Sequence, residues 1–467
     1  MPKVLLINPS IFHWEDDESS YHPHRVKTHL LELFSYLRFV GIDTAVLDLE
    51  LEIGRPRDGG GKENFSREAV RLISQFDFDI AAISCWSSLH YLSSLAVADM
   101  CREINHNCCI VVGGHHPTAL PSDFIYEGSP FDYIVQGEGE SALADICKKH
   151  DGRRREPQIL QGTLLDMTKN IPHDWAGYPY AVPNRGVSMC LSRGCPFKCT
   201  FCFNTHKNAW RNLSVSDAID KVKCVIDTLN PFFLRFEDLF FGYNVQWRRA
   251  FLSSLERIAP PTLFFWAFFR ADFLEKEDID LLSRLNFTVG LGLESGSPEM
   301  LTIMQKTPNP EKYLNRSRDA IHYLNLKDIP HDIFVLFNHP GETYDTYTTT
   351  VGYLQSLLAG HETLSGVIWP QNFFLSPGSP SFLNLDYYER TYGTVVKHKQ
   401  WWKEEADHYA LSTAVIASED LMKRFSGADY WLDAFNEINT EIRRKLSAKT
   451  HKFYNHMNMA NLPYPLK

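Results

Sequence analysis

The sequence predicts an α/β protein with more than one domain, on three observations. At 467 residues the chain is longer than one hydrophobic core usually organises. Short, almost continuous apolar runs alternate with segments of helical periodicity, which is typical of parallel strands covered by helices on both faces. A stretch with several prolines, residues 151–185, interrupts this pattern and is expected to be a linker before a second strand-helix series.

Residues 1–150 are expected to form a doubly wound, Rossmann-like domain. Its expected strands are KVLLINP, TAVLDLE, DIAAISCW and CCIVVGG, with helices over THLLELFSYLRFVG and LSSLAVADMCREI. DYIVQGEGESALADICKK is expected to be a fifth strand that runs through a glycine turn into a helix. Such domains bind ligands beyond the carboxyl ends of their strands. Three turns at these ends, SCWSS, GGHHPT and GEGE, have an unusual composition, and their glycines allow backbone amides to approach a ligand. Any one of them alone would be an ordinary turn, but three on one edge predict a binding site.

Residues 186–375 are expected to form a partial barrel of the TIM type, (β/α)6. The strands are expected over GVSMCLSRGC, FFLRFED, TLFFWAFFRAD, FTVGLGLESG and HDIFVLFNHPGET, each followed by a helical stretch. The chemistry of such barrels takes place at the carboxyl ends of the strands.

Residues 376–467 are expected to form a helical C-terminal subdomain, with helices over KHKQWWKEEADHY and DYWLDAFNEINTEIRRKL. Its aromatic side chains could stack on a planar substrate, but aromatics at helical spacing more often belong to a core. These residues are Trp401, Trp402, Tyr409, Tyr430 and Trp431.

Composition narrows the class of protein. The net charge of -10 argues against a nucleic-acid partner, because phosphate backbones are held mainly by an excess of Lys and Arg. No window approaches the roughly 18 apolar residues of a membrane span, and the first residues lack the features of a signal peptide. We therefore expect a cytoplasmic protein without a membrane partner. Its ten cysteines are then expected to be thiols and metal ligands.

Three cysteines, Cys195, Cys199 and Cys202, lie in the segment SRGCPFKCTFCF with the spacing C-x3-C-x2-C, after the first expected barrel strand. Iron-sulfur clusters commonly take four cysteines, so a cubane held by three keeps one iron without a protein ligand. The alternative is a closed structural zinc site in which His206 is the fourth ligand. The loop alone leaves both interpretations open.

With the downstream segments included, residues 186–345 resemble the radical S-adenosylmethionine (SAM) superfamily. The resemblance implies a [4Fe-4S] cluster on the three cysteines, SAM chelated to the open iron, and a 5'-deoxyadenosyl radical. Asn338 and His339 depart from the usual glycine and apolar residue, which predicts a reshaped adenine or substrate side. The positions that match SAM contacts of the family are Phe201, Glu237, Asp238, Arg270, Glu294 and Pro340.

The N-terminal region resembles the cobalamin-binding module that precedes the radical domain in one large subgroup. VVGGHHPTALPSDFI and DYIVQGEGESAL carry this likeness. There is no D-x-H-x-x-G sequence, so the resemblance implies cobalamin without a histidine ligand and a lower-face residue between Trp86 and Leu89. A module that keeps the fold but has lost the cofactor is the alternative. The residues expected to contact cobalamin are Ser84, Ser87, Gly113, Gly114, His116, Thr118, Gly137, Glu138 and Gly139.

The two resemblances together imply a cobalamin-dependent radical SAM methyltransferase. We expect it to act on an unactivated carbon of a small molecule in natural-product biosynthesis, through methylcobalamin, with flavodoxin or ferredoxin as external electron donor. The second interpretation keeps the cofactors but has an oxidative cyclisation, ring contraction or rearrangement as its reaction. The third is a zinc-stabilised binding protein without catalysis. No motif identifies the substrate or a catalytic side chain.

Overall fold

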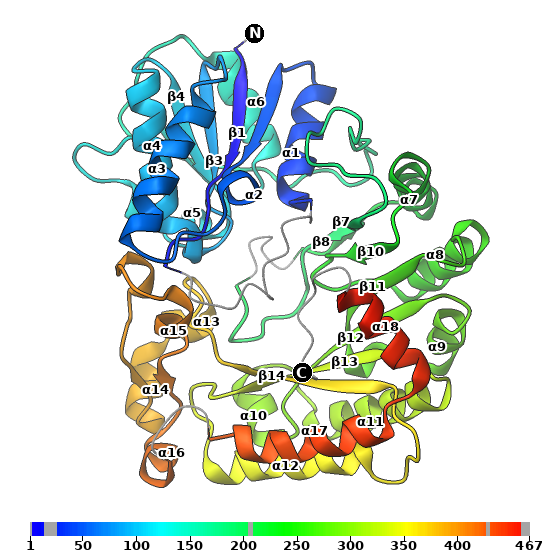
Figure 1. Ribbon diagram of the computed structural model, residues 1–467. Helices are drawn as coiled ribbons and strands as arrows, with labels where there is room; N and C mark the ends of the chain where they lie inside the picture. The colour runs from blue at the N-terminus through cyan, green and yellow to red at the C-terminus, as the bar shows by residue number, and fades with distance from the viewer. Residues whose placement is uncertain (1, 14–25, 204–208, 426–429, 459–467) are drawn as a thin grey trace.

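A parallel six-stranded sheet, sheet A, forms the N-terminal part of the computed structural model (Figure 1), which describes residues 2–13, 26–203, 209–425 and 430–458. Its strand order is β2-β1-β3-β4-β5-β6. The five strands expected within residues 1–150 all form. A sixth, β6, lies inside residues 151–185, where a linker without elements was expected; it is short and mostly exposed, so its apolar pattern is weak. The strands are β1 (Val4–Asn8), β2 (Thr44–Asp48), β3 (Ile80–Ser84), β4 (Cys109–Gly113), β5 (Tyr133–Gln136) and β6 (Gln158–Gln161).

Helices cover both faces of sheet A, which confirms the doubly wound fold. Alternate strand residues pack on opposite sides: Leu6 lies in one core cluster with α1 and α6, and Ile7 in another with α3 and α4. Helix α3 was not expected, because its first turn is glycine-rich; the Asp58 side chain caps it by accepting from the Gly61 amide. The helices are α1 (Thr28–Phe39), α2 (Leu49–Ile53), α3 (Gly59–Ile73), α4 (Tyr91–Ile104), α5 (His115–Ala119) and α6 (Glu140–Lys149).

A second parallel six-stranded sheet, sheet B, follows in the order β14-β13-β12-β11-β10-β7. β7 and β14 are its two edges, so the barrel is partial, as expected. The strands are β7 (Gly186–Met189), β10 (Phe233–Phe236), β11 (Phe264–Arg270), β12 (Phe287–Glu294), β13 (His331–Phe337) and β14 (Gly366–Asn372). The helices outside it are α7 (Val215–Leu229), α8 (Val245–Ile258), α9 (Lys276–Leu282), α10 (Pro298–Ile303), α11 (Pro310–Leu326) and α12 (Tyr344–Leu358).

The two faces of sheet B differ. Phe236 and Phe265 stack on each other, and Phe236 also packs on Phe251 of α8, so these side chains form the outer core beneath the helices. Trp266 alternates with Phe265 and points to the other side, which we call the inner face. Helix α18 packs on this inner face, where the Tyr454 hydroxyl donates to Asp332 near the start of β13.

The C-terminal region is helical, as expected, but it is divided between the two sheets. The long helix expected over KHKQWWKEEADHY is wrong: Trp401 and Trp402 lie in a short 3-10 turn and are buried in the core of sheet A, where the Trp402 indole donates to Asp123. This tertiary contact overrides the local helical pattern. Trp431 instead stacks on Phe337 of sheet B. These tryptophans are therefore core residues.

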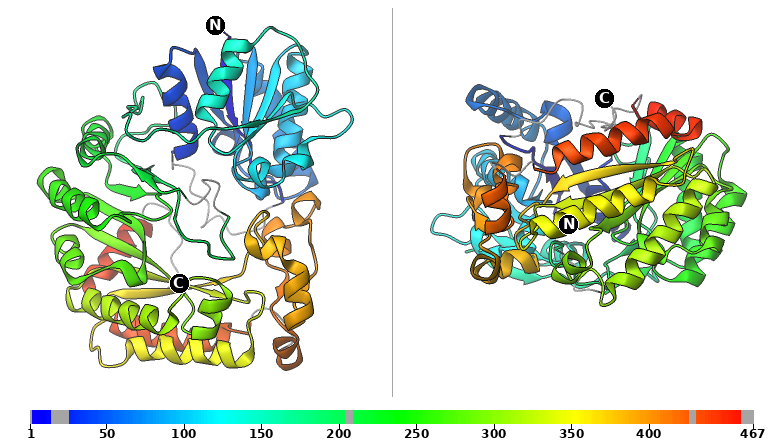
Figure 2. Two further views of the ribbon diagram at one scale, coloured as in Figure 1. Left: turned by 180° about the vertical axis from the view of Figure 1, so that it is seen from behind. Right: turned by 90° about the horizontal axis from the view of Figure 1, so that it is seen from below.

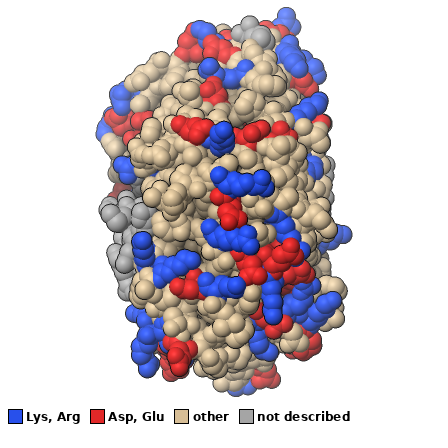
Figure 3. All heavy atoms as spheres, turned by 90° about the vertical axis from the view of Figure 1, so that its right-hand side faces the viewer, with Lys and Arg blue, Asp and Glu red and all other residues tan. Residues whose placement is uncertain are grey.

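Segments α13 to α16 run beside both sheets, as the two opposite views in Figures 1 and 2 show, and α17 packs against α12 and β14. The elements are α13 (Pro380–Leu383), α14 (Leu385–Tyr392), β15 (Val395–Val396), α15 (His408–Ser412), β16 (Val415–Ile416), α16 (Glu419–Arg424), α17 (Leu432–Lys445) and α18 (Ala448–Asn458). Basic and acidic side chains are interspersed over the face in Figure 3. None of the described helices combines the length and apolar character needed to cross a membrane.

Candidate functional site

The loop that carries the three cysteines, residues 194–203, leaves sheet B at the carboxyl end of β7. An antiparallel pair of short strands, β8 (Ser192–Arg193) and β9 (Arg211–Asn212), forms its base. Asp238, which follows β10, is buried and accepts hydrogen bonds from the Leu191 and Ser192 amides and from the Ser192 hydroxyl. Burial raises the pKa of Asp238 to about 6. The position matched to a SAM contact therefore also fixes the start of this cysteine loop.

The middle of the cysteine loop is tied to three other segments through Thr200. Its amide donates to the Met304 carbonyl at 2.9 Å, and its carbonyl accepts from the Ser381 amide at 2.8 Å. Its hydroxyl lies 3.0 Å from Nε2 of His339. These contacts fix the backbone directly after Cys199 and so preorganise this part of the loop for ligand binding.

The three cysteine sulfurs influence one another. Burial and the neighbouring Cys199 and Cys195 thiols raise the pKa of Cys202 to about 12, whereas Lys306 lowers it. The structure thus brings the three predicted ligands together. Among the described residues, no three His, Cys, Asp or Glu side chains converge as ligands of one metal ion. A cubane engages each cysteine through a different iron, so its ligands need not converge. His206 lies outside the described residues.

Two cations lie beside the cysteine loop. Lys306 forms an ion pair with Glu294 (Nζ to Oε1, 2.9 Å), and Arg270 donates from Nη1 to the Lys306 carbonyl at 2.9 Å. The Arg270 guanidinium stacks over Phe197, which lies between Cys195 and Cys199, with Cζ 3.9 Å from the ring centroid. Burial lowers the pKa of Lys306, but the charges of Glu294, Tyr313 and Cys199 outweigh it and raise the pKa. Lys306 therefore carries a positive charge next to the thiols.

The remaining residues matched to SAM contacts lie apart. Phe201 packs edge-on against His339, with ring centroids 6.4 Å apart. Glu237 faces sheet A, where its carboxylate accepts from the Thr28 hydroxyl of α1 at 2.9 Å. Pro340 lies in the turn after β13, and its carbonyl lies 2.8 Å from Nδ1 of His339. The structure thus groups Arg270 and Glu294 around Lys306, Phe201 and Pro340 around His339, and Glu237 at the junction with sheet A.

Asn338 and His339, which depart from the family pattern, link this turn to the C-terminal region. Asn338 has a φ of 61°, and its side chain bonds both the Val415 carbonyl and the Ala417 amide. His339 is fully buried, and its Nε2 lies 3.2 Å from the Ser381 hydroxyl. Both departures therefore join the late-strand turn to the segment that bridges the two sheets.

Glu342 of the same turn makes stability depend on pH. Its buried carboxylate accepts from the Asn338 amide and the Tyr430 hydroxyl, and burial raises its pKa from 4.5 to about 7. A raised pKa in the folded state stabilises the fold at low pH, and this contribution is lost as pH rises from 4.5 to about 7, at about 1.4 kcal/mol per pH unit. Glu342→Gln stays uncharged, so urea unfolding between about pH 5 and about pH 7.5 should show wild type losing stability relative to it. Parallel pH profiles would refute this assignment.

The three turns at the carboxyl edge of sheet A, which we call the rim, are packed against one another. Gly114 has a φ of 121°, and a Cβ there would lie 2.4 Å from the Cys85 carbonyl, so the packing of this loop requires a glycine. The Thr118 hydroxyl donates to the Gly114 carbonyl and accepts from the Gly137 amide. Gly113 pairs with Ser84 at the strand ends. The rim is therefore a rigid edge.

The structure separates the rim residues that are enclosed from those that are accessible. His116, expected to contact cobalamin, is buried, with its ring nitrogens 2.7 Å from the Ser88 hydroxyl and 3.2 Å from the Asp123 carboxylate. Ser87 lies 3.0 Å from Nδ1 of His90. At Gly139, by contrast, a Cβ would meet no atom within 4 Å.

Trp86 is the most accessible large side chain of the rim, with 43% of its surface exposed. Its indole stacks on His29 of α1 at 4.6 Å between centroids, and His115 packs on it at 4.5 Å. The His115 ring lies 6.2 Å from that of Phe203 in the cysteine loop. The rim of sheet A and the cysteine loop are therefore direct neighbours.

Comparison with known families accounts for both parts of this arrangement. Residues 30–147 match the model of the B12 binding domain, and residues 189–354 match the model of the radical SAM superfamily. The chain belongs to the B12-binding radical SAM enzymes. Its cofactors are therefore cobalamin, SAM and a [4Fe-4S] cluster.

Relatives of this radical SAM enzyme include methyltransferases and a cyclase. An uncharacterised methyltransferase of Pyrococcus horikoshii is 26% identical over 336 residues, which cover 64% of this chain and 69% of that protein. An anaerobic magnesium-protoporphyrin IX monomethyl ester cyclase of Cereibacter sphaeroides is 24% identical over 53% of this chain and 44% of its own length. The radical SAM methyltransferase TsrM of Kitasatospora setae, solved with tryptophan substrate and a SAM analogue, has a TM-score of 0.69 at 15% identity, covering 95% of this chain and 90% of that chain. The likeness to TsrM shows a shared fold.

The residues at both sites fit these cofactors. Three thiols within electrostatic reach of one another, with Lys306 and Arg270 beside them, suit a negatively charged cluster, whose properties depend on nearby charge. On the rim, the exposed face of Trp86 and the open space at Gly139 leave room for a large planar cofactor.

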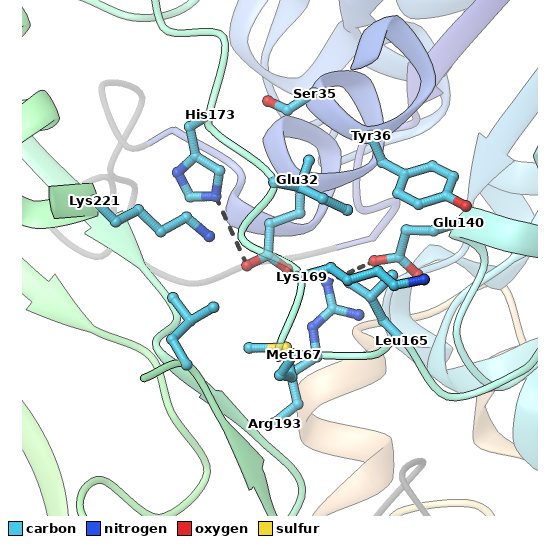
Figure 4. Close-up of a pocket in the computed structure, with 12 residues that line it drawn as sticks. Glu32, Ser35, Tyr36, Glu140, Leu165, Met167, Lys169, His173, Arg193 and Lys221 are labelled. Atoms are coloured by element: carbon cyan, nitrogen blue, oxygen red, sulfur yellow. Dashed lines mark hydrogen bonds and ion pairs between the residues drawn. The ribbon is translucent and has the colours of Figure 1, made fainter. Parts of the chain in front are cut away.

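Arg193, two residues before Cys195, connects the B12-binding domain to the radical SAM domain. Its guanidinium lies 2.7 Å from Glu32 of α1, 2.5 Å from Glu140 and 3.2 Å from Glu138. Arg211 also bonds Glu138, so this carboxylate, expected to contact cobalamin, is tied to the β8–β9 pair at the base of the cysteine loop. Figure 4 shows the Arg193 side chain with Glu32 and Glu140 at a small pocket between the domains. We call the ion-paired side chains of Arg193, Arg211, Glu32, Glu138 and Glu140 the interdomain clasp.

Sequence reasoning missed several of these residues for a physical reason. The clasp joins Arg193 to Glu32 across 161 positions, and no local pattern indicates such a pairing. Lys306 follows a helix, and only its burial in the structure distinguishes it from an ordinary surface lysine. His115 and His116 are neighbours at the start of α5, yet His116 is buried whereas His115 packs on Trp86. The GGHHPT sequence alone does not reveal which of the two is enclosed.

Proposed function

We propose that this cobalamin-dependent radical SAM enzyme transfers a methyl group to an unactivated carbon of a small molecule. The observation that carries the proposal is the direct contact of the two candidate cofactor sites, with the His115 ring 6.2 Å from Phe203 next to Cys202. A substrate between them would reach both cofactors. An unactivated carbon needs both, because radical formation and methyl supply are separate tasks.

In this proposal the chain binds, orients and shields while the cofactors supply the radical and the methyl group. Cys195, Cys199 and Cys202 hold the cluster, and Arg270 and Lys306 balance its charge. Trp86, the most accessible side chain in the segment after β3, would contact cobalamin from the rim. The clasp keeps the two sites at a fixed separation. An external electron donor such as flavodoxin or ferredoxin reduces the cluster.

The relatives support two reaction types. The Pyrococcus horikoshii protein and TsrM are methyltransferases by name, which favours methyl transfer and, through TsrM, a small aromatic substrate of natural-product type. The cyclase of Cereibacter sphaeroides favours the second candidate, an oxidative cyclisation with the same cofactors. Methyl transfer is the better supported of the two, because the relative with the longer match is a methyltransferase.

A product assay separates the two candidates. The anaerobically reconstituted protein is incubated with candidate small molecules, dithionite and SAM labelled in its methyl group. Methyl transfer predicts 5'-deoxyadenosine, S-adenosylhomocysteine and label in the product; cyclisation predicts 5'-deoxyadenosine and an unlabelled product. The Cys199→Ala variant is the matched control and should give neither. S-adenosylhomocysteine and labelled product without 5'-deoxyadenosine would contradict the radical route.

A further inference from the structure

An arginine on the inner face of sheet B lies in unusual surroundings. Arg235 is the third residue of β10, and its side chain is 24% exposed. Its Cζ lies 4.3 Å from the centroid of the Trp266 ring and 5.6 Å from that of Phe268. Two aromatic faces thus hold the guanidinium in one orientation while part of it stays accessible.

Arg235 lacks the partners that other buried arginines have. Within the described part of the chain its guanidinium donates no hydrogen bond, and its Nε is buried without a partner. The nearest carboxylate oxygen, of Glu237, is 3.9 Å away. By comparison, Arg193 and Arg248 have carboxylate oxygens at 2.5 and 2.6 Å. A buried N–H without a hydrogen bond is costly, and the accessible part of the guanidinium is open to an anionic partner from outside the chain.

The other acidic group near Arg235 is already occupied. Asp332 accepts from the indoles of Trp266 and Trp369, each at 2.8 Å, and from the Tyr454 hydroxyl. These three donors already hold the Asp332 carboxylate, and it forms no ion pair with Arg235. Burial lowers the pKa of Arg235, and the charges of Glu237 and Asp332 only partly oppose this. The two carboxylates therefore do not fully offset the positive charge of Arg235.

The inner face leads from Arg235 to the cysteine loop. Trp266, Phe268 and Arg270 alternate along β11 and share this face, and Arg270 stacks on Phe197 within the loop. Four strand residues span about 13 Å, the length of a small metabolite. Phe334 packs on Phe268 at 5.4 Å and stacks on Trp369 at 6.4 Å, so the path is aromatic.

We propose that Arg235 binds an anionic group of the substrate, a carboxylate or a phosphate, and that the apolar body of the substrate lies along these aromatic side chains toward the cysteine loop. This inference rests on the proposed function, since it names the substrate class of the same site. The planar guanidinium offers two parallel donors that match either anion. Arg235 is thus a substrate-binding residue that determines specificity.

Probe binding tests the assignment on reconstituted full-length protein by equilibrium dialysis. Phenylacetate and phenyl phosphate are the anionic probes, and phenylacetamide is the uncharged counterpart. An anionic probe should bind wild type about tenfold more tightly than phenylacetamide, and Arg235→Gln should weaken anion binding about ten- to hundredfold while leaving phenylacetamide unchanged. The tighter of the two anions identifies the group. Arg257→Gln, on the exposed side of α8, should bind as wild type does.

The proposal is overturned if wild type binds the three probes equally or if Arg235→Gln keeps its anion affinity. Arg235→Lys keeps the charge but loses the planar fork, so a several-fold loss is expected there even if the glutamine variant does not fold. Both variants should retain the cluster absorbance of wild type. If wild type forms no 5'-deoxyadenosine from SAM but binds anions through Arg235, the proposed function fails and this assignment stands.

Discussion

Cys199→Ala is expected to remove nearly all cluster iron and sulfide from the reconstituted protein while cobalamin binding stays at the wild-type level. Cys199 is the buried central ligand of the three, and two remaining thiolates leave two irons of a cubane without protein ligands. The cobalamin site should persist, because the rim uses loops of sheet A. Iron, sulfide and cobalt analysis with ultraviolet-visible spectra gives the result.

Cys224→Ala is the matched control, because Cys224 is exposed on α7 outside the cysteine loop. It should keep the iron, sulfide and cobalamin content of wild type. A Cys199→Ala protein that retains its iron would remove the assignment of the cluster ligands. Loss of both cofactors together would show instead that the two sites are not separable.

Arg193→Met is expected to destabilise the fold by about 3–5 kcal/mol. The side chains of Arg193 and Glu140 are at most 10% exposed, and the substitution removes the cation that pairs with the buried Glu140 carboxylate. Urea unfolding measures the effect as a lower midpoint, and cluster assembly should be impaired because Arg193 lies two residues before Cys195.

Arg284→Met is the control for the loss of a surface ion pair, since Arg284 is 55% exposed and pairs with Glu256 at 3.5 Å. Its cost should be within about 1 kcal/mol. Adding Glu140→Gln to Arg193→Met should recover part of the lost stability, because one unpaired charge is removed. If Arg193→Met and Arg284→Met both lowered the free energy of unfolding by the same small amount, the proposed stabilising role of the clasp would be contradicted.

The sequence predicted five strands of each sheet because their apolar runs are long enough to stand out from the flanking turns. It missed β6, which is mostly exposed, β14, whose second half is polar and partly exposed, and α3, whose first turn is glycine-rich. The helix expected around Trp401 fails because the core of sheet A, far away in sequence, takes that side chain. Local patterns thus determine elements, whereas long-range packing decides the exceptions.

The residues of the candidate site likewise fall into those that local sequence predicts and those that depend on long-range contacts. The three cysteines could be predicted because their ligand spacing is local. Asp238 was expected at a strand end, but its partners are the amides of a loop 46 and 47 positions away. Arg235 gave no signal in the sequence, because its aromatic neighbours come from a different strand. Contacts across strands and domains therefore had to come from the structure.

The most direct test of the account is the electron paramagnetic resonance spectrum of the reduced, reconstituted protein before and after SAM is added. The account predicts a [4Fe-4S] signal whose g values change on addition, because one iron of a cluster held by Cys195, Cys199 and Cys202 remains open to SAM. An unchanged spectrum, or protein that contains one zinc and no iron, would contradict it.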